Sequence, residues 1–203
     1  MTGLHAGRDS QRTLLIACGA LAREIVELIR LNAWSHLSVT CLPAIWHNTP
    51  ERIPEAVRAK IQAARGDYDR IYVVYGDCGT GGLLDRVLEE EGVERIGGPH
   101  CYAFYSGLDA FEAAHDAEPA CFYLTDYLVR HFDRLIIQGL GLDRHPELLK
   151  DYFGNYKTLV YLAQTDDPAL RAQAEAAAAR LELTYEHRMT GYGELGDFMR
   201  AAS

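Results

Sequence analysis

The alternation of two kinds of segment constrains the fold of this chain more than any single motif does. Short runs of β-branched and apolar residues predict strands at Arg12–Ala17, Leu37–Leu42, Arg70–Tyr75, Val93–Ile96, Thr158–Ala163 and Leu181–Glu186. Helical periods between them predict helices at Ala20–Leu31, Pro54–Ala64, Leu83–Glu91, Asp126–Gln138, His145–Phe153 and Pro168–Arg180. This alternation is typical of a mostly parallel sheet with helices on both faces, so we expect an α/β fold.

Domain organisation follows from the same pattern and from length. The stretch from about residue 99 to 155 shows helical periods only, which predicts a helical insertion that caps the sheet. Thr125 and Gly139 have the residue types of an N-cap and a C-cap for its long helix. Residues 1–11 are polar and are expected to be flexible. A chain of 203 residues fits one domain, so we predict a single α/β domain over residues 12–203.

Charge and composition narrow the class of partner. The formal net charge of −9 argues against a general grip on nucleic acid or on an anionic membrane, because both need clustered Lys and Arg. No run of apolar residues is long enough for a membrane span, and the first residues lack the apolar core of a signal peptide. We therefore expect a cytoplasmic protein with a small-molecule substrate.

Three of the five cysteines follow predicted strands. Cys18 follows the first strand, Cys78 the third and Cys101 the fourth, each beside one or more glycines. Because parallel strands end at one edge of the sheet, and ligands of such sheets bind beyond that edge, we expect the three sulfur atoms to share one neighbourhood. Cys41 and Cys121 lie in or beside apolar runs and are interpreted as core residues.

Sulfur atoms in that neighbourhood favour a soft metal ion. A thiol at the start of a helix is stabilised as the thiolate, and three thiolates repel one another unless a cation neutralises them. Cys18, Cys78 and Cys101 are thus predicted ligands of zinc, with His100 as a fourth ligand or as a replacement for Cys101. An iron–sulfur cluster is the alternative cofactor. Two other interpretations stay open: a catalytic thiol with helper residues, and cysteines that only pack in the core.

Residues around the cysteines are the predicted substrate contacts. The turn VVYGDCGTGG joins a strand to a helix, as phosphate-binding loops do, but it lacks the Lys-Ser/Thr of a P-loop. His47 follows the second strand and is expected to line the same crevice. Tyr102, which follows Cys101, and Glu194, which follows the last predicted strand, are further candidates. The alternative interpretation is that these are ordinary core and turn residues. The predicted substrate-binding residues are Gly19, His47, Gly79, Thr80, Gly81, Gly82, Tyr102 and Glu194.

A family resemblance rests on motifs spread over residues 12–198: ACGALAREI, VVYGDCGTGG, GPHCYAFYSG, LTDYLVRHFDRL, GLGLDRHPEL, YFGNYKTLVYLAQTDDPAL and TGYGEL. Together they resemble the uncharacterised family catalogued as domain of unknown function 1638. The resemblance implies an association with corrinoid-dependent methyl transfer, and hence a methyltransferase or a corrinoid protein as partner. The chain lacks a DxHxxG signature, so we do not expect it to bind the corrinoid itself.

These expectations give a first hypothesis and two alternatives. The first is a metal-dependent enzyme, or an accessory to one, that acts in methyl-group and one-carbon metabolism with the metal as Lewis acid. The second is a module that delivers a metal or cofactor to a methyltransferase without catalysing a reaction. The third is an enzyme with a cysteine nucleophile, a histidine partner and no metal.

Overall fold

The computed structural model describes residues 11–117 and 120–203, and for residues 114–117 it describes the backbone only. The predicted flexible segment, residues 1–11, lies outside the described residues except for Gln11. The chain divides into two compact units. The first unit comprises residues 1–99 and 198–203, and the second unit comprises residues 100–197. No helix in the described ranges is both long and apolar enough to cross a membrane.

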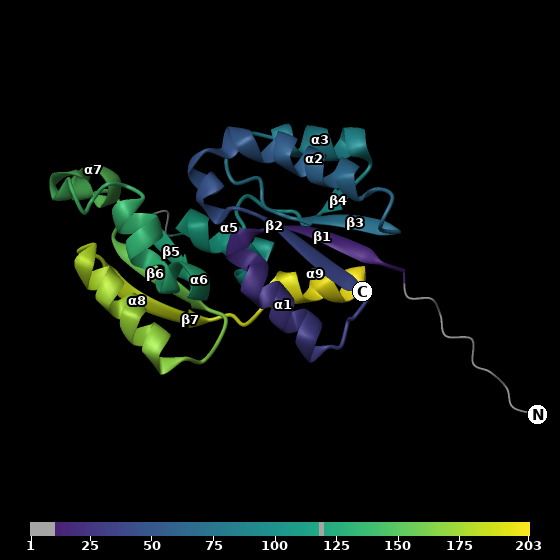
Figure 1. Ribbon diagram of the computed structural model, residues 1–203. Coiled ribbons are helices and arrows are strands. Elements are labelled where there is room, and N and C mark those ends of the chain that lie inside the picture. Colours follow the sequence, from purple (N-terminus) through teal and green to yellow (C-terminus); the bar gives the residue numbers. More distant parts are fainter. Residues whose placement is uncertain (1–10, 118–119) are drawn as a thin grey trace, which may run out of the picture. The chain divides into compact units, whose positions relative to one another are not determined.

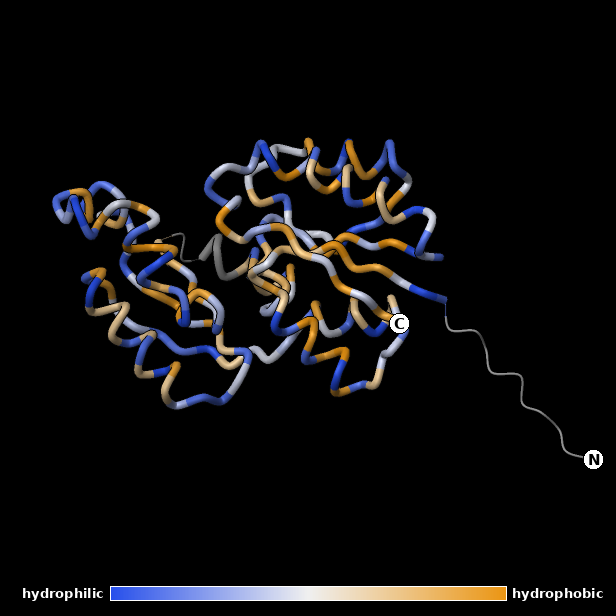
Figure 2. Tube along the Cα trace, in the orientation of Figure 1, coloured by the Kyte–Doolittle hydropathy of each residue, from blue (hydrophilic) through white to orange (hydrophobic). Residues whose placement is uncertain are grey.

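The first unit is built on a four-stranded parallel sheet (Figure 1). Its strands are β1 (Thr13–Cys18), β2 (Leu37–Leu42), β3 (Arg70–Val74) and β4 (Glu94–Arg95), in the spatial order β2-β1-β3-β4. All six residues of β1 are buried, as a central parallel strand requires, since helices cover both of its faces. Figure 2 shows hydrophobic residues along the strands of this sheet.

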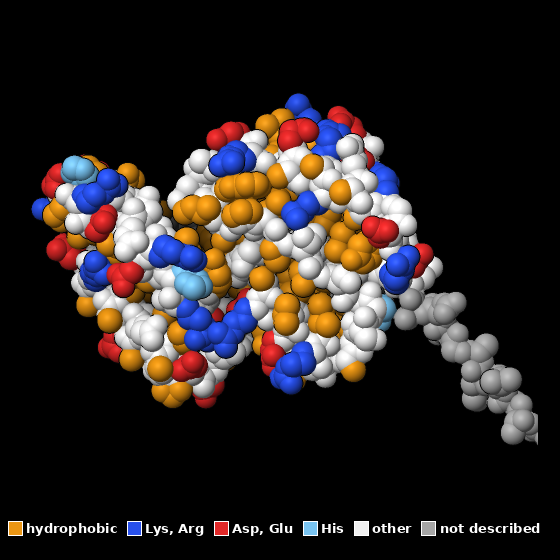
Figure 3. Space-filling model, in the orientation of Figure 1, with side chains coloured by type: hydrophobic (Ala, Val, Ile, Leu, Met, Phe, Trp, Pro, Cys, Tyr) orange, Lys and Arg blue, Asp and Glu red, His pale blue; other side chains and the backbone are white. Residues whose placement is uncertain are grey.

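Three helices of more than two turns and a set of single turns connect these strands. The helices are α1 (Ala22–Leu31), α2 (Ile53–Ala64) and α3 (Leu83–Glu91), and the 3₁₀ turns are η1 (Gly19–Leu21), η2 (Ala44–Asn48) and η3 (Pro50–Arg52). In Figure 1, α2 and α3 lie together on one face of the sheet and α1 lies on the other. Basic and acidic side chains are mixed on the outer surface of α2 and α3 (Figure 3). Among them, Arg65 forms a salt bridge with Glu91 at 2.7 Å.

The second unit is built on a three-stranded parallel sheet, in the order β5 (Cys121–Thr125), β6 (Thr158–Ala163), β7 (Thr184–Met189). One face packs against α6 (Asp126–Arg130), α7 (Leu149–Phe153) and α8 (Pro168–Arg180). The other face packs against α4 (Ala103–Ser106) and α5 (Leu108–Ala117). The remaining elements are η4 (Asp133–Gln138), which is a π-helical turn, η5 (Pro146–Leu148) and α9 (Gly193–Ala202), whose last five residues belong to the first unit.

The α/β class with parallel strands is confirmed, but the middle of the chain differs from the prediction. The structure has two sheets where one was expected, and β5 lies inside the stretch predicted to be purely helical, which is therefore wrong for residues 121–125. A five-residue apolar run such as CFYLT cannot be told from a buried helical turn by periodicity alone. Thr125 is confirmed as an N-cap, because its hydroxyl accepts a hydrogen bond from the Leu128 amide at 3.4 Å.

The predicted long helix ends early, and the last strand starts late. Regular α-helix stops at Arg130, and the π-helical turn η4 follows before Gly139, whose φ of −61° is not that of a left-handed C-cap. The last strand was predicted at 181–186 but forms three residues further on, because Leu181 closes α8 and Glu182 turns with a φ of +60°.

A buried carboxylate joins two strand ends of the second unit. Asp126 is only 2% exposed and directly follows β5. Its oxygens accept hydrogen bonds from the Tyr161 hydroxyl at 2.7 Å, the Gln164 amide at 3.0 Å and the Thr165 hydroxyl at 2.5 Å. Burial and the neighbouring Asp126 carboxylate raise the pKa of Tyr161. The network satisfies a charge that would otherwise be costly to bury, and it holds the end of β5 to the end of β6.

Two glycines between β7 and α9 share a left-handed backbone but have different surroundings. Gly191 has a φ of +60° and open space where a Cβ would stand. Gly193 has a φ of +46°, and a Cβ there would lie 2.3 Å from the Tyr105 carbonyl oxygen and 2.6 Å from that of Phe104. The chain leaving β7 thus packs against the backbone of α4, which only glycine permits.

We expect Gly193→Ala to destabilise the protein more than Gly191→Ala. Both variants incur the backbone cost of a left-handed residue, about 1–2 kcal/mol. Gly193→Ala adds a steric clash of about 1–3 kcal/mol. Urea unfolding of both variants and the wild type measures the difference. Equal destabilisation would contradict the close approach of this segment to α4.

Candidate functional site

The strand order of the first unit fixes where a ligand would bind. From β1 the chain goes to β2 on one side and later to β3 on the other, so the order reverses between β1 and β3. In open α/β sheets the crevice beyond the carboxyl ends at such a switch point is the usual ligand site. Cys18 is the last residue of β1, and Cys78 lies four residues beyond the end of β3 at Val74. Both cysteines are therefore at the switch point, and their sharing of one neighbourhood with Cys101 stays a prediction.

Cys78 occupies a sharp turn between β3 and α3. Its φ is +48°, a left-handed backbone that non-glycine residues rarely adopt, and its side chain is 5% exposed. Two backbone hydrogen bonds anchor the turn: the Asp77 amide donates to the Gly98 carbonyl at 2.9 Å and the Cys78 amide donates to the Pro99 carbonyl at 2.8 Å. The structure therefore holds the thiol in a backbone geometry that costs free energy, which is a common property of functional residues.

The backbone amides of the glycine-rich turn donate hydrogen bonds to a carboxylate of the same turn, that of Asp77. Asp77 accepts hydrogen bonds from the amides of Gly79 at 3.2 Å, Gly81 at 3.2 Å and Gly82 at 2.9 Å, and from the Thr80 hydroxyl at 2.6 Å. Burial raises the pKa of the Asp77 carboxyl, but these hydrogen bonds outweigh it and lower the pKa. The amides that would cradle a phosphate already have an anionic acceptor. The geometry therefore does not favour a phosphate cradle, and substrate contacts by these four residues stay a prediction.

Gly19 lets the chain after β2 pass over the end of β1. A Cβ at Gly19 would lie 2.9 Å from the Leu42 carbonyl oxygen and 3.3 Å from the Ala44 nitrogen. This close approach leads the chain directly into η2, which carries His47. Close packing thus requires glycine at position 19. Gly19 affects the site indirectly, because it positions the segment that carries His47.

His47 reaches from β2's side of the sheet to Cys78, which follows β3. Its hydrogen bond to the Cys78 side chain raises the pKa of His47, burial lowers it, and negative charge on Cys78 and Cys18 raises it further. The net direction is upward, so the folded protein favours the imidazolium form of His47. An imidazolium beside a thiolate is the arrangement that activates cysteine nucleophiles.

A second cation lies near the turn. The Arg95 Nε donates a hydrogen bond to the Asp85 carboxylate at 2.5 Å, and a terminal nitrogen of Arg95 donates to the Ile96 carbonyl oxygen at 2.9 Å. These two contacts fix the position of the guanidinium. Its hydrogen bond to Asp85 raises the pKa of Arg95, burial lowers it, and the charges of Asp85, Asp77 and Cys78 raise it. Arg95 therefore adds positive potential to the surroundings of Cys78.

Cys41 and Cys121 lie in surroundings that differ from those of Cys78. Burial raises the pKa of Cys41, as does the nearby charge of Cys18, while Lys60 lowers it. The net effect raises the pKa of Cys41 and so disfavours its thiolate form, although Cys41 is half-buried and more exposed than Cys18 or Cys78. Cys121 is buried in the core against β6, as predicted. None of the five cysteines, all of which are described, forms a disulfide.

The predicted site residues with higher numbers lie in the second unit. His100 stacks on Tyr102, with ring centroids 5.1 Å apart, and Tyr102 packs in turn on Phe111 and Tyr123. Cys101 is buried at the start of this unit. Glu194 accepts a hydrogen bond from the Leu108 amide at 2.9 Å, at the start of α5. Tyr102 and Glu194 thus have structural roles here, and their contact with a substrate stays a prediction.

The predicted metal ligands are Cys18 and Cys78 of the first unit and His100 and Cys101 of the second unit, and His47 is a further donor next to Cys78. Cys18, His47 and Cys78 have the soft donor atoms that zinc prefers. Among the side chains that the structure describes, those of residues 11–113 and 120–203, however, no three from His, Cys, Asp or Glu are grouped so as to hold a metal ion. Cys18, His47 and Cys78 of the first unit therefore do not by themselves form a metal site as placed. A centre that joins Cys18 and Cys78 to Cys101 and His100 spans the two units and stays a prediction.

Comparison with known proteins gives one finding. Residues 41–199 match the family described as Protein of unknown function (DUF1638). The chain belongs to this family. The match runs from the end of β2 into α9 and so includes His47, Cys78 and Cys101, while Cys18 precedes it. Neither the curated proteins nor the solved structures contain a match to the chain.

Removal of the Cys78 thiol is expected to lower the pKa of His47. In Cys78→Ala the imidazolium loses its hydrogen bond and the adjacent negative charge. Because the folded pKa is raised, the pair stabilises the protein below the ordinary histidine pKa of about 6.5, and this stability is lost as the pH rises through the raised value. NMR titration of the His47 ring in both proteins measures the shift, and an unchanged pKa would contradict the pairing.

The strained turn predicts a difference between two small replacements of Cys78. Both Cys78→Ala and Cys78→Gly remove the thiol, but only glycine adopts the φ of +48° without cost. We expect Cys78→Gly to be more stable than Cys78→Ala by about 1 kcal/mol. Chemical denaturation of the two variants at one pH gives the comparison. A more stable alanine variant would show that the turn relaxes when the thiol is removed.

Proposed function

We propose that the first unit is a cysteine-based catalytic centre in which Cys78 is the nucleophile and His47 is its proton partner. The observation that carries this proposal is the hydrogen bond between the two side chains at the β1/β3 switch point, with His47 shifted toward its protonated form. Activated nucleophiles are recognised by a base within hydrogen-bond reach.

The local backbone supports the same role. In hydrolases with a nucleophile elbow, the nucleophile stands in a strained turn between a strand and a helix, flanked by small residues. Cys78 has this placement between β3 and α3, with Gly76 two residues before it and Gly79 directly after it. The likeness is one of local geometry only and does not indicate a common fold.

The chemistry requires only groups that the centre contains, together with its substrates. The Cys78 thiolate forms a bond to an electrophilic carbon, and the bond from that carbon to its leaving group breaks. The leaving group departs with the bonding electrons and takes a proton from the His47 imidazolium. A second substrate, water or a thiol, then returns a proton to His47 and displaces the carbon from Cys78.

The family resemblance suggests the first electrophile to test. A setting in methyl-group metabolism makes a one-carbon unit the transferred group, and a small carbon centre suits a thiol that is only 5% exposed. The proposal also assumes a reducing cytoplasm, since a cysteine nucleophile must stay reduced. The competing proposal, in which Cys78 binds zinc and acts through the metal, predicts a different response to chelation.

Alkylation kinetics test the proposal. The protein is treated with limiting iodoacetamide, and the rate at each cysteine is measured by peptide mass spectrometry. We expect Cys78 to react faster than Cys41 despite its lower exposure, and His47→Gln to slow Cys78 by roughly tenfold or more, because a thiolate loses its charge partner. His145→Gln is the matched control, since His145 is an exposed histidine of the second unit.

Metal analysis of anaerobically purified protein accompanies these rates. Unchanged alkylation after treatment with a chelator is the expected result. Stoichiometric zinc, together with alkylation of Cys78 that accelerates on chelation, would overturn the metal-free proposal in favour of the metal centre. A Cys78 rate that is insensitive to His47→Gln would overturn both the pairing and the proton role of His47.

A further inference from the structure

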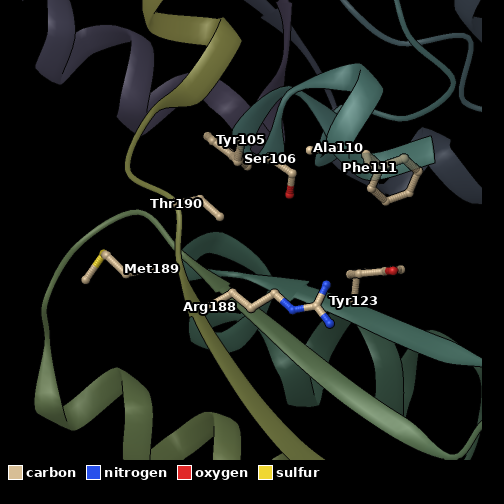
Figure 4. Close-up of a pocket in the computed structure, with 8 residues that line it drawn as sticks. All are labelled: Tyr105, Ser106, Ala110, Phe111, Tyr123, Arg188, Met189 and Thr190. Atoms are coloured by element: carbon tan, nitrogen blue, oxygen red, sulfur yellow. The ribbon is translucent and has the colours of Figure 1, made fainter. Parts of the chain in front are cut away.

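The second unit contains a pocket between its sheet and two of its helices. Helices α4 and α5 line one side of the pocket, and strands β5 and β7 line the other (Figure 4). The cavity measures about 400 Å³, which is within the range of about 300–1,000 Å³ typical of small-molecule sites. It reaches the carboxyl end of β7, and this is the edge at which parallel sheets bind ligands.

The one charged side chain among the described lining residues, that of Arg188, is already paired. Arg188 lies opposite Leu162 in the sheet and Glu186 lies opposite Val160, and these two apolar residues belong to the face that α4 and α5 cover. Both charged side chains of β7 are therefore on this face, because alternate residues of a strand share a face. The Arg188 Nε donates a hydrogen bond to the Glu186 carboxylate, so the guanidinium is not an open receptor for an anion.

The pocket has one hydroxyl group that is open to a ligand, that of Ser106 at the end of α4. Ser106 forms no hydrogen bond through this hydroxyl with any residue that the structure describes. Figure 4 shows its oxygen turned into the pocket. The other hydroxyl at this edge differs, because Thr190 donates to the Ala163 carbonyl oxygen at 3.2 Å. A serine hydroxyl can both donate and accept, so it can bind a carbonyl, amide or hydroxyl group of a ligand.

A packed aromatic wall stands on another side of the pocket. Phe111 and Tyr123 are buried, and their ring centroids are 5.3 Å apart. Tyr102 packs behind both rings, with its centroid 5.5 Å from that of Phe111 and 5.6 Å from that of Tyr123. Met189, an adaptable apolar side chain, is half exposed at the edge of the pocket. Such a surface favours a ligand with a flat apolar body.

The charges around the pocket favour an uncharged ligand. A carboxylate would lose its hydration beside the Glu186 carboxylate, next to an arginine that is already paired. A cation would meet the Arg188 guanidinium. The start of α5 does not attract an anion either, because its Leu108 amide donates to the Glu194 carboxylate at 2.9 Å. A neutral molecule incurs none of these costs.

We infer that the second unit binds a small uncharged molecule with a flat apolar ring against Phe111 and Tyr123 and an amide, carbonyl or hydroxyl group on Ser106. The inference uses residues of the second unit alone, so it stands or falls independently of the catalytic role of Cys78.

Three probes of similar size test the inference on the full chain, with binding measured by titration of ¹⁵N-labelled protein. They are 3-phenylpropionamide, its acid 3-phenylpropionate, and 3-cyclohexylpropionamide, whose ring is not flat. We expect the phenyl amide to shift resonances of the pocket residues and to bind about fivefold or more tightly than the acid, because only the acid must bury an unpaired charge. We expect it to bind about threefold or more tightly than the cyclohexyl amide, which cannot stack on the aromatic wall.

Three variants complete the experiment. Ser106→Ala is expected to weaken binding of the phenyl amide about threefold to tenfold, which is the effect of one lost hydrogen bond. Ala110→Phe places a ring in the pocket and should weaken both amides. Ser35→Ala is the matched control, since Ser35 is an exposed serine of the first unit, and it should leave binding unchanged. Spectra of the unliganded variants establish that each is folded.

Four outcomes would overturn the inference. They are binding of the acid as tight as that of the phenyl amide, binding of the cyclohexyl amide as tight as that of the phenyl amide, undiminished binding of the phenyl amide by a folded Ser106→Ala, and no binding of the phenyl amide at its solubility limit.

Discussion

The candidate centre of the first unit depends on one close approach between backbone segments. After β2 the chain crosses the end of β1 at Gly19, where the missing side chain leaves room for the Leu42 carbonyl. Without this crossing His47 would stay on the β2 side of the sheet, separated from Cys78 by the width of β1. The packing at Gly19 takes no part in any chemistry, but it places the imidazole of His47 beside the thiol of Cys78.

The two units use parallel strands differently. In the first unit the strand order reverses at β1, and His47 from the segment after β2 meets Cys78 from the turn after β3 at that edge. In the second unit the strands follow in sequence order without reversal, and their carboxyl edge is partly closed by the Asp126 network. Its pocket lies instead between the sheet and the helices α4 and α5, where a strand-borne arginine can project. Parallel strands thus position a candidate thiol centre in the first unit and a pocket between sheet and helices in the second unit.

The sequence predicted what local patterns encode. The bounds of α3 and α8 agree with the periodicity, and the placement of Cys18, His47 and Cys78 beyond parallel strands follows from strand order along the chain. The hydrogen bond between His47 and Cys78 depends on the crossing at Gly19, a contact between distant segments that no local pattern specifies. Arg188 was missed because the predicted strand ended at Glu186; the alternation of Tyr185, His187 and Met189 with Glu186 and Arg188 was the available signal.

The carboxylate of Asp77 has a consequence for what can approach the thiol. In nucleotide-binding loops the amides at a strand-to-helix turn are vacant and draw in phosphate oxygens. Here the amides of Gly79, Gly81 and Gly82 already donate to the Asp77 carboxylate of the same turn, so they are not vacant for a phosphate oxygen. A phosphate group that reached this turn would therefore have to displace a carboxylate that the chain itself supplies, and the residue next to Cys78 makes the loop a poor anion receptor despite its glycines.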